Sequence, residues 1–199
     1  MQRLLCLLIG YSCGCLLTGE LVARLRTGCS ASVLGTGNPG MANLTHELGL
    51  RWGLTVLLGD IGKTALAWSL CQLLFCPGLR TAGLWAGLGA VLGHNFPIWR
   101  RFRGGKGVAV TCAALILSAP LWGTLSCLLG LAVTLFTGYL PLGAVVIPTL
   151  FLLSVPAWGT VEVFLLALLL SVLMFSRHIR GLQRMIRGEE PRKFRRNQP

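Results

Sequence analysis

Charge is the property that this chain has least of. Only 12% of its 199 residues are charged, and Asp and Glu together number six. About a quarter of the residues in an ordinary soluble domain are charged, so the composition argues against a soluble domain. Hydrophobic residues make up 54% of the chain, and the mean hydropathy is +0.71. The composition predicts an all-α polytopic membrane protein, with one membrane-embedded domain over residues 1–199 and a basic tail at 177–199.

Paired cysteine motifs are also missing, and no cleavable leader is expected. None of the eight cysteines forms a C-x-x-C pair, which argues against a zinc or disulfide framework. We expect most of these cysteines to be buried as small hydrophobic residues. The apolar run at the N-terminus continues to about Val22 without a convincing cleavage pattern, so it is expected to span the membrane.

Long apolar runs divide the chain into about seven predicted transmembrane helices. They cover roughly 4–22, 50–75, 81–99, 108–118, 121–136, 141–155 and 160–176. Several are shorter than the ~20 residues that a perpendicular helix needs. Five spans remain an alternative if 108–176 forms two long helices, but the prolines in that region favour four short ones.

Basic residues gather in a few polar segments. They fall at 24–26, at 100–106 and in the tail from 177 to 196, whereas the only charge between Lys106 and Arg177 is Glu162. This distribution follows the positive-inside rule, so it predicts an outside N-terminus and a cytoplasmic C-terminus. The net charge of +12 therefore indicates topology and tail contacts with anionic lipids, and no nucleic-acid partner.

Two glycine-rich stretches on the predicted cytoplasmic side interrupt the apolar runs. Glycine lets backbone N–H groups converge on an anion, and a nearby lysine adds a positive charge. The chain is thus predicted to bind phosphate, although flexible loops with a topology-setting lysine are the simpler alternative. The candidate phosphate- or acyl-phosphate-binding residues are Gly35, Thr36, Gly37, Asn38, Gly40, Asn43, Gly104, Gly105, Lys106 and Gly107.

Two nucleotide-binding interpretations fail. Residues 35–40 match G-x-G-x-x-G, but a dinucleotide fold needs a βαβ unit around this motif, and none fits here. Gly62-Lys63-Thr64 is typical of a P-loop, yet the first glycine of that motif would fall at Leu57. Asp60 and Lys63 stand one helical turn apart in an apolar segment, so we expect them to pair with each other, with a direct catalytic role as the alternative.

The three histidines lie in segments predicted to be polar and cytoplasmic. Soluble-type acyltransferases use H-x-x-x-x-D and hydrolases use G-x-S-x-G, and both motifs are absent. No metal site is expected, because cysteines and carboxylates other than Glu47 are missing from the same segments. The candidate acceptor-binding or catalytic residues are Lys106, His46, His94, Arg177 and His178.

These stretches resemble the motifs of the bacterial acyl-phosphate:glycerol-3-phosphate acyltransferases, the PlsY family. The first family motif is similar to residues 35–43. The second is similar to Gly93-His94-x-Phe96-Pro97 together with residues 102–109. The third is similar to Arg177-His178 followed by Arg184, Gly188 and Glu190. The resemblance covers essentially the whole chain and implies the same topology of seven spans.

The resemblance implies transfer of an acyl group from acyl phosphate to the 1-hydroxyl of glycerol 3-phosphate, giving lysophosphatidic acid and phosphate. It implies no cofactor and a multi-pass protein of the bacterial inner membrane, in contact with membrane lipids, with its active site facing the cytoplasm. An acyl phosphate is already activated, so the site has only to hold two anions and orient the attacking hydroxyl. The oligomeric state is left open.

Several polar positions depart from the family pattern. The usual Arg appears as His46, the usual Asn as Gly181, and the usual Arg-Tyr-x-Ser as Gly138-Tyr139-Leu140-Pro141. Thr36, Ala42 and Arg103 replace Ser, Thr and Lys. An alternative is therefore a non-catalytic or acceptor-altered paralogue that binds acyl phosphate or lipid. A transporter or pore is a weaker alternative, because the stretch 107–176 offers only Glu162 as a charge to line a path.

Overall fold

The described part of the chain is helical and contains no strand. The computed structural model describes residues 1–76 and 78–192, so Pro77 and the end of the predicted basic tail, 193–199, lie outside the described residues. The α-helices are α1 (Gln2–Gly14), α2 (Thr18–Thr27), α3 (Met41–Leu48), α4 (Leu50–Phe75), α5 (Ala82–Asn95), α6 (Val108–Ser118), α7 (Pro120–Thr137), α8 (Leu140–Ser154) and α9 (Val161–Ile186). Short 3₁₀ turns η1 (Ala31–Val33), η2 (Ile98–Arg100) and η3 (Val155–Ala157) complete the described elements.

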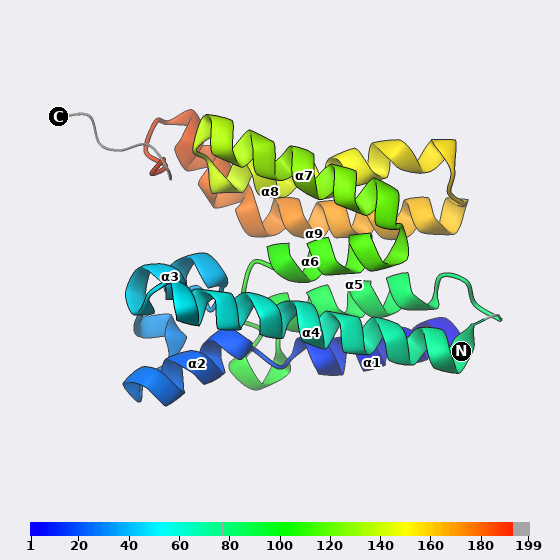
Figure 1. Cartoon of the computed structure of the whole chain (residues 1–199), viewed down its shortest axis with the longest axis horizontal. Helices are drawn as coiled ribbons and strands as arrows, with labels where there is room; N and C mark the ends of the chain where they lie inside the picture. The colour runs from blue at the N-terminus through cyan, green and yellow to red at the C-terminus, as the bar shows by residue number, and fades with distance from the viewer. Residues whose placement is uncertain (77, 193–199) are drawn as a thin grey trace.

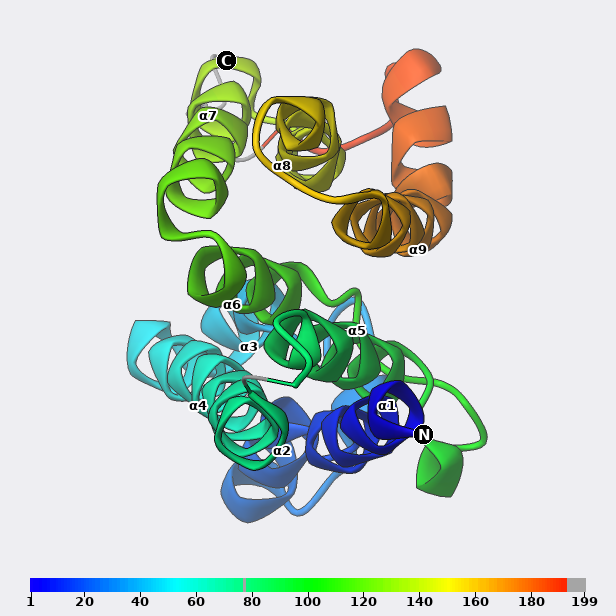
Figure 2. The same ribbon diagram turned by 90° about the vertical axis from the view of Figure 1, so that its right-hand side faces the viewer.

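The long helices run roughly parallel to one axis and form two groups. Helices α1 to α6 make one group, and α7, α8 and α9 make the other, with α6 between them (Figures 1 and 2). The N-terminus lies at one end of the bundle, and α9 finishes at the opposite end (Figure 1). This agrees with the predicted placement of the two termini on opposite faces, whereas the direction of the bundle in a membrane stays a prediction.

Most predicted spans correspond to observed helices. The predictions 50–75 and 108–118 coincide with α4 and α6. The expected span 81–99 is wrong at its end, because α5 stops at Asn95. Pro97 disfavours helical backbone at the preceding residue, and Phe96 has φ −134°. The expected end at 176 is also wrong, since α9 contains no proline and continues through Gly181 to Ile186.

The first predicted span, 4–22, is in fact two helices separated at Cys15–Leu17. The break frees backbone carbonyls part-way along the bundle, within its apolar length, where each needs a partner. Trp99 Nε1 donates to the Cys15 carbonyl at 2.8 Å, and Lys63 Nζ donates to the Leu16 carbonyl at 2.7 Å. Side chains from other elements therefore stabilise the break.

Two of the bundle helices are too short to cross a bilayer alone. At 1.5 Å per residue, α5 and α6 measure about 21 and 17 Å, against a hydrocarbon core of about 30 Å. Five stretches of the described chain are long and apolar enough to span, with α1 and α2 counted together. The turn between α5 and α6 thus begins inside the length of the bundle.

Small residues allow α1 and α5 to pack closely. A methyl group on Gly10 or Gly14 of α1 would overlap the Ala86 or Ala90 carbonyl of α5. Close approach through small residues is a common way for membrane helices to associate, because lipid gives no hydrophobic drive between them. This packing holds α5, and the turn that follows it, firmly in the bundle.

Large apolar side chains form the main core around α5, α6, α8 and α9. Phe151 of α8 and Leu166 and Leu170 of α9 are among its buried members. The expected burial of most cysteines is wrong, because only Cys6 and Cys71 are buried. Cys29 and Cys76 are exposed beyond the ends of their helices, and the partly buried ones are Cys13, Cys15, Cys112 and Cys127.

Candidate functional site

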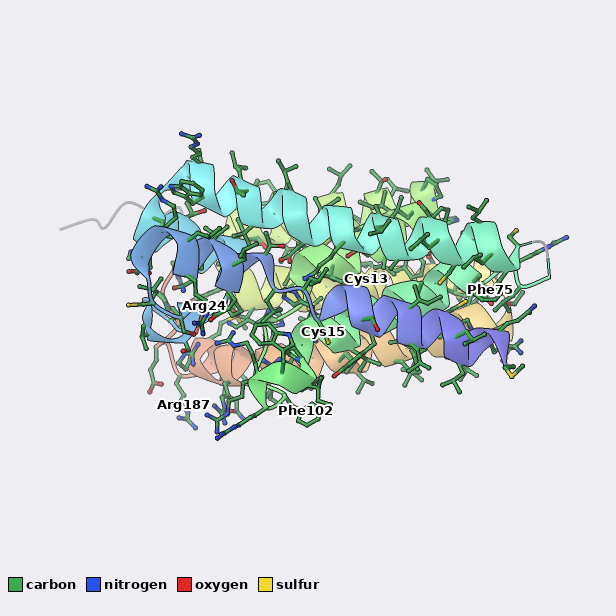
Figure 3. All side chains as sticks on the ribbon, turned by 90° about the horizontal axis from the view of Figure 1, so that it is seen from below. Cys13, Cys15, Arg24, Phe75, Phe102 and Arg187 are labelled. Atoms are coloured by element: carbon green, nitrogen blue, oxygen red, sulfur yellow. The ribbon has the colours of Figure 1, made fainter. Side chains whose placement is uncertain are left out.

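The polar segments meet at one end of the bundle. Figure 3 shows nitrogen-tipped side chains, including Arg24 and Arg187, at the end of the bundle opposite Phe75. Arg100 of the α5–α6 turn lies 3.4 Å from Glu20 on α2, and Arg177 of α9 donates to the same turn. The prediction that both glycine-rich stretches and the described start of the tail share one end is confirmed.

The first glycine-rich stretch is a loop that closes on its own side chains. Gly35 and Gly37 have positive φ angles of 49° and 73°, which glycine adopts readily. The Asn43 carbonyl oxygen accepts from the Thr36 backbone N–H at 2.9 Å and from the Thr36 hydroxyl at 3.0 Å. Asn43 also donates to the Leu34 carbonyl at 2.9 Å. Thr36 and Asn43 therefore fix the loop, and their role as direct phosphate ligands stays a prediction.

The loop leads into α3, a helix that the sequence analysis missed. Gly40 is its N-cap, with Asn38 beside it, and Pro39 packs against Gly19 of α2. The segment is short and interrupted by glycines at both ends, so it gives little periodic signal. The N–H groups of the first turn of α3 point out of the helix start and form part of the polar end.

The turn between α5 and α6 adopts unusual backbone conformations. Arg101 and Phe102 have φ angles of 52° and 61°, which L-residues rarely adopt. Side chains tie the turn down: Tyr11 Oη donates to the Phe96 carbonyl at 2.8 Å, and Arg100 reaches Ser30 Oγ at 3.3 Å. Strain of this kind persists where the surroundings impose it, and it is common at functional sites.

Gly104 and Gly105 pack against the end of α5. Their N–H groups donate to the carbonyls of Asn95 and His94 at 3.1 and 2.9 Å. The prediction that these two N–H groups are offered to an anion is therefore wrong, because they cap α5 instead. A side chain on Gly105 would overlap the His94 ring, so the glycines are required by close packing.

Unused hydrogen-bonding groups lie at the start of α6, directly after this turn. Gly107, with φ 78°, is the N-cap, and the N–H groups of the next three residues precede the first helical bond. The fully buried side chains of Asn95 and Thr111 have no hydrogen-bond partner within the described residues. A helix N-terminus with such groups favours an anion.

Two cations flank this helix start. Lys106 is half-buried, and burial lowers the pKa of its ammonium group, while the nearby Glu190 raises it. Arg177 donates to the carbonyls of Gly105 and Gly104 at 3.2 and 3.3 Å and lies over the Phe96 ring. Arg177 thus holds the turn that carries Lys106.

The three histidines differ in their surroundings. His94 and His178 are buried within α5 and α9, so their expected placement in polar segments is wrong. His178 Nδ1 lies 2.9 Å from the Met174 carbonyl. A carbonyl only accepts, so Nδ1 carries the proton and Nε2 keeps a lone pair. His46 is exposed on α3 and bonds to Glu47 at 2.8 Å.

Two departures from the family pattern lie in contact. Pro141 is the second residue of α8, Gly181 lies on α9, and a side chain on Gly181 would overlap the Pro141 ring. Beside them, Arg184 pairs with Glu190 at 2.7 Å, and Arg192 donates to Tyr139 Oη at 3.0 Å. The absence of a side chain at Gly181 therefore leaves the space that the Pro141 ring occupies.

Glu20 of α2 organises the polar end and was missed by the sequence analysis. Its carboxylate accepts from Arg24 at 2.7 Å, from Ser30 at 3.1 Å and from the Ala31 N–H at 3.0 Å. Arg100 approaches it from the α5–α6 turn. A single carboxylate thus joins the segment that follows α2 to the α5–α6 turn. The only feature of the sequence that indicates such a role for Glu20 is the scarcity of acidic residues.

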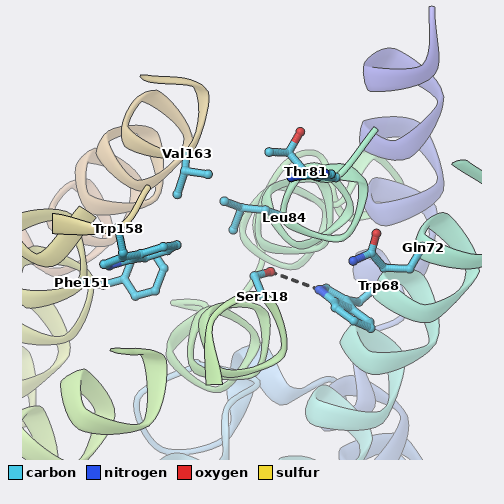
Figure 4. A pocket seen from close by; sticks show the side chains of 9 residues that line it. Trp68, Gln72, Thr81, Leu84, Ser118, Phe151, Trp158 and Val163 are labelled. Carbon is cyan, nitrogen blue, oxygen red and sulfur yellow. Dashed lines mark hydrogen bonds between the residues drawn. The ribbon is translucent and has the colours of Figure 1, made fainter. Parts of the chain in front are cut away.

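The opposite end holds a small cavity of a different character. It has a volume of about 50 Å³ and is lined by residues of α4, α5, α6 and the α8–α9 junction (Figure 4). Trp68 Nε1 donates to Ser118 Oγ at 3.1 Å, and Gln72 Oε1 and Thr81 Oγ1 are buried without a partner in the described chain. At ~30 Å³ per molecule, this space suits one or two waters.

The family model described as glycerol-3-phosphate acyltransferase matches residues 4–188. A protein of Alkaliphilus metalliredigens named glycerol-3-phosphate acyltransferase is 30% identical over 190 residues, which are 96% of this chain and 95% of that protein. One of Lactobacillus johnsonii, named glycerol-3-phosphate acyltransferase 1, is 37% identical over 131 residues, or 66% of this chain. The alignments with the L. johnsonii and L. acidophilus proteins cover 63% and 56% of those relatives.

The fold is similar to solved structures of an integral membrane protein. The crystal structure of PlsY (YgiH), an integral membrane glycerol 3-phosphate acyltransferase, in its glycerol 3-phosphate form matches with a TM-score of 0.86 and 28% identity, over 96% of each chain. The lysophosphatidic acid form of that protein matches with a TM-score of 0.85 and 27% identity, over 96% of this chain and 95% of that one.

Proposed function

Because the chain belongs to the glycerol-3-phosphate acyltransferase family, we propose that it transfers an acyl group from acyl phosphate to glycerol 3-phosphate. The products are lysophosphatidic acid and inorganic phosphate. The observation that carries the proposal is the start of α6, where free N–H groups, Lys106 and the Arg177-held turn meet at the polar end.

In the proposed reaction, the 1-hydroxyl oxygen attacks the acyl carbonyl carbon, and the bond from that carbon to the phosphate oxygen breaks. The hydroxyl proton passes to a substrate phosphate or to the lone pair on His178 Nε2. Lys106 and the α6 N–H groups neutralise the departing phosphate. Because acyl phosphate is already activated, this chemistry needs only positioning and charge stabilisation, and no enzyme nucleophile.

The test of the donor uses the purified protein in detergent or vesicles. Acyl phosphate and acyl-CoA of the same chain length are each offered with labelled glycerol 3-phosphate, and labelled lysophosphatidic acid is measured. Formation from acyl phosphate alone supports the proposal. Formation from acyl-CoA alone would contradict the proposed donor.

A second candidate is an acceptor-altered or non-catalytic paralogue. The Pro141–Gly181 contact favours it, because it places apolar surface where the family pattern has polar side chains. A panel of phosphorylated and neutral polyols separates the candidates: greater turnover with another polyol would identify an altered acceptor. Binding of acyl phosphate with no release of phosphate for any acceptor would indicate a non-catalytic protein.

We further propose one membrane domain over the whole chain, placed in the bacterial inner membrane with the polar end facing the cytoplasm. Cys29 and Cys76 are exposed at opposite ends of the bundle and serve as natural probes. Two variants of the protein, each with Cys29 or Cys76 as its single cysteine, are expressed in intact cells. An impermeant maleimide should label Cys76 and spare Cys29. Labelling of Cys29 from outside would contradict the orientation.

A further inference from the structure

An ion pair that the proposed chemistry does not use is buried in the bundle next to the turn. Asp60 and Lys63 of α4 form a pair of 2.8 Å, as the sequence analysis predicted, with 4% and 5% of their side chains exposed. Charged groups at such positions are costly in a membrane protein and are retained mainly where they have a function. The two charges therefore need an explanation beyond the stability of the bundle.

Lys63 makes contacts that lead from the pair toward the turn. Its ammonium group donates to the Leu16 carbonyl at 2.7 Å and lies 2.9 Å from His94 Nδ1. The Asp60 carboxylate is 3.6 Å from the same ring nitrogen, which is too long for a hydrogen bond. Lys63 is thus the hydrogen-bond partner of Nδ1.

This contact determines the tautomer of His94. An ammonium group only donates, so Nδ1 has to accept and carries no proton. The neutral ring then carries its proton on Nε2, which is the nitrogen that faces Gly105. Within the described residues, no side chain or carbonyl forms a hydrogen bond with this Nε2–H group. It is an unused donor at the turn that carries Lys106.

We propose that the Asp60–Lys63 pair holds His94 as an Nε2–H donor, which binds a phosphate oxygen of the donor substrate at the Gly104–Gly107 turn. Asp60 and Lys63 are positioning residues that act through His94. The inference rests on the proposed function for the identity of the phosphate. His178 has the opposite tautomer. His94 therefore offers a hydrogen-bond donor at Nε2, and His178 offers an acceptor at Nε2.

The tautomers can be measured without any variant of the pair. The full chain, labelled with ¹⁵N-histidine, is studied by NMR in detergent, and the substitution His94→Gln assigns the signals of that ring. We expect the Nε2–H form for His94 and the Nδ1–H form for His178, which serves as an internal control. A protonated Nδ1 on His94, as a neutral ring or an imidazolium, would overturn the proposal.

Binding is tested with inorganic phosphate as the probe. Titration should shift the ¹⁵N signal of His94 Nε2, and no shift at saturating phosphate would contradict a phosphate contact. This readout does not depend on turnover. If acyl transfer fails while the tautomer and the shift are observed, the proposed function is wrong and the inference about His94 stands.

Kinetics separate positioning from stability. Lys63→Met should lower kcat about tenfold to a hundredfold, the range typical of one misplaced group, with little change in the KM for glycerol 3-phosphate. Lys63→Arg, which still donates to Nδ1, should recover part of the loss. The matched control is Glu162→Gln, which breaks the Arg3–Glu162 pair at the other end and should leave kcat unchanged. An unchanged kcat in folded Lys63→Met would overturn the positioning role.

Discussion

The two ends of the bundle use charge in different ways. At the end near the N-terminus, Arg3, Trp85 and Glu162 join α1, α5 and α9, and the unpartnered Gln72 and Thr81 line only a cavity of about 50 Å³. At the other end, a strained turn, buried histidines and cations surround the start of α6, where donors remain unused. Unpartnered groups around a cavity of water size indicate bound water, whereas unpartnered donors beside cations at a helix start indicate a place for an anionic ligand.

Among substitutions at positions other than Lys106, the largest effect expected on this contrast comes from Gly105→Ala. The added methyl group would overlap the His94 ring and displace the turn, and a shift of about 1 Å in a catalytic group can cost a hundredfold in rate. Steady-state kinetics on the purified variant measure the loss. The control is Gly62→Ala on α4, where a methyl group meets open space. Equal activity of both variants would show that the turn is only a flexible loop.

Arg177→Lys should have the next largest effect. A lysine lacks the rigid fork by which two nitrogens of the guanidinium reach the Gly105 and Gly104 carbonyls. We expect kcat to fall about tenfold, because the turn that carries Lys106 is then held less firmly. The exposed Arg180→Lys on the same helix is the control. A loss of the same size in both variants would point to a general effect of replacing an arginine on α9, and not to the contact of Arg177 with the turn.

Glu162→Gln tests the opposite end. Removing the carboxylate charge loses the ion pair with Arg3, while the Trp85 hydrogen bond can persist. A thermal unfolding scan should show a lower Tm, by a few degrees, and turnover per folded molecule should stay the same. A fall in kcat at unchanged Tm would show that the two ends of the bundle are coupled. The difference between a structural end and a functional end would then not hold.

His46→Arg is expected to have the smallest effect. The arginine restores a permanent charge, so the KM for glycerol 3-phosphate should fall about two- to fivefold, in line with a weak, exposed charge contact. The exposure of His46 and its bond to Glu47 limit the gain. No change in KM would show that this position does not contact the acceptor.

The sequence predicted the features that depend on composition and local pattern. The helices α4 and α6, the shared polar end and the Asp60–Lys63 pair followed from apolar runs, basic clusters and helical spacing. The roles of Glu20, Asn43 and the Gly104–Gly105 N–H groups did not, because each depends on contacts between segments far apart in the chain. The break after Gly14 was missed for the same reason, since its carbonyls are satisfied by Lys63 and Trp99.

The central claim is that the polar end of the bundle performs acyl transfer from acyl phosphate. The most direct measurement is the rate at which labelled lysophosphatidic acid forms from acyl phosphate and glycerol 3-phosphate with the folded Lys106→Ala variant and with the native protein. Loss of a charge facing a phosphate dianion should lower the rate on the order of a thousandfold, equivalent to about 4 kcal/mol of transition-state stabilisation. A variant that retains near-native turnover would contradict the claim.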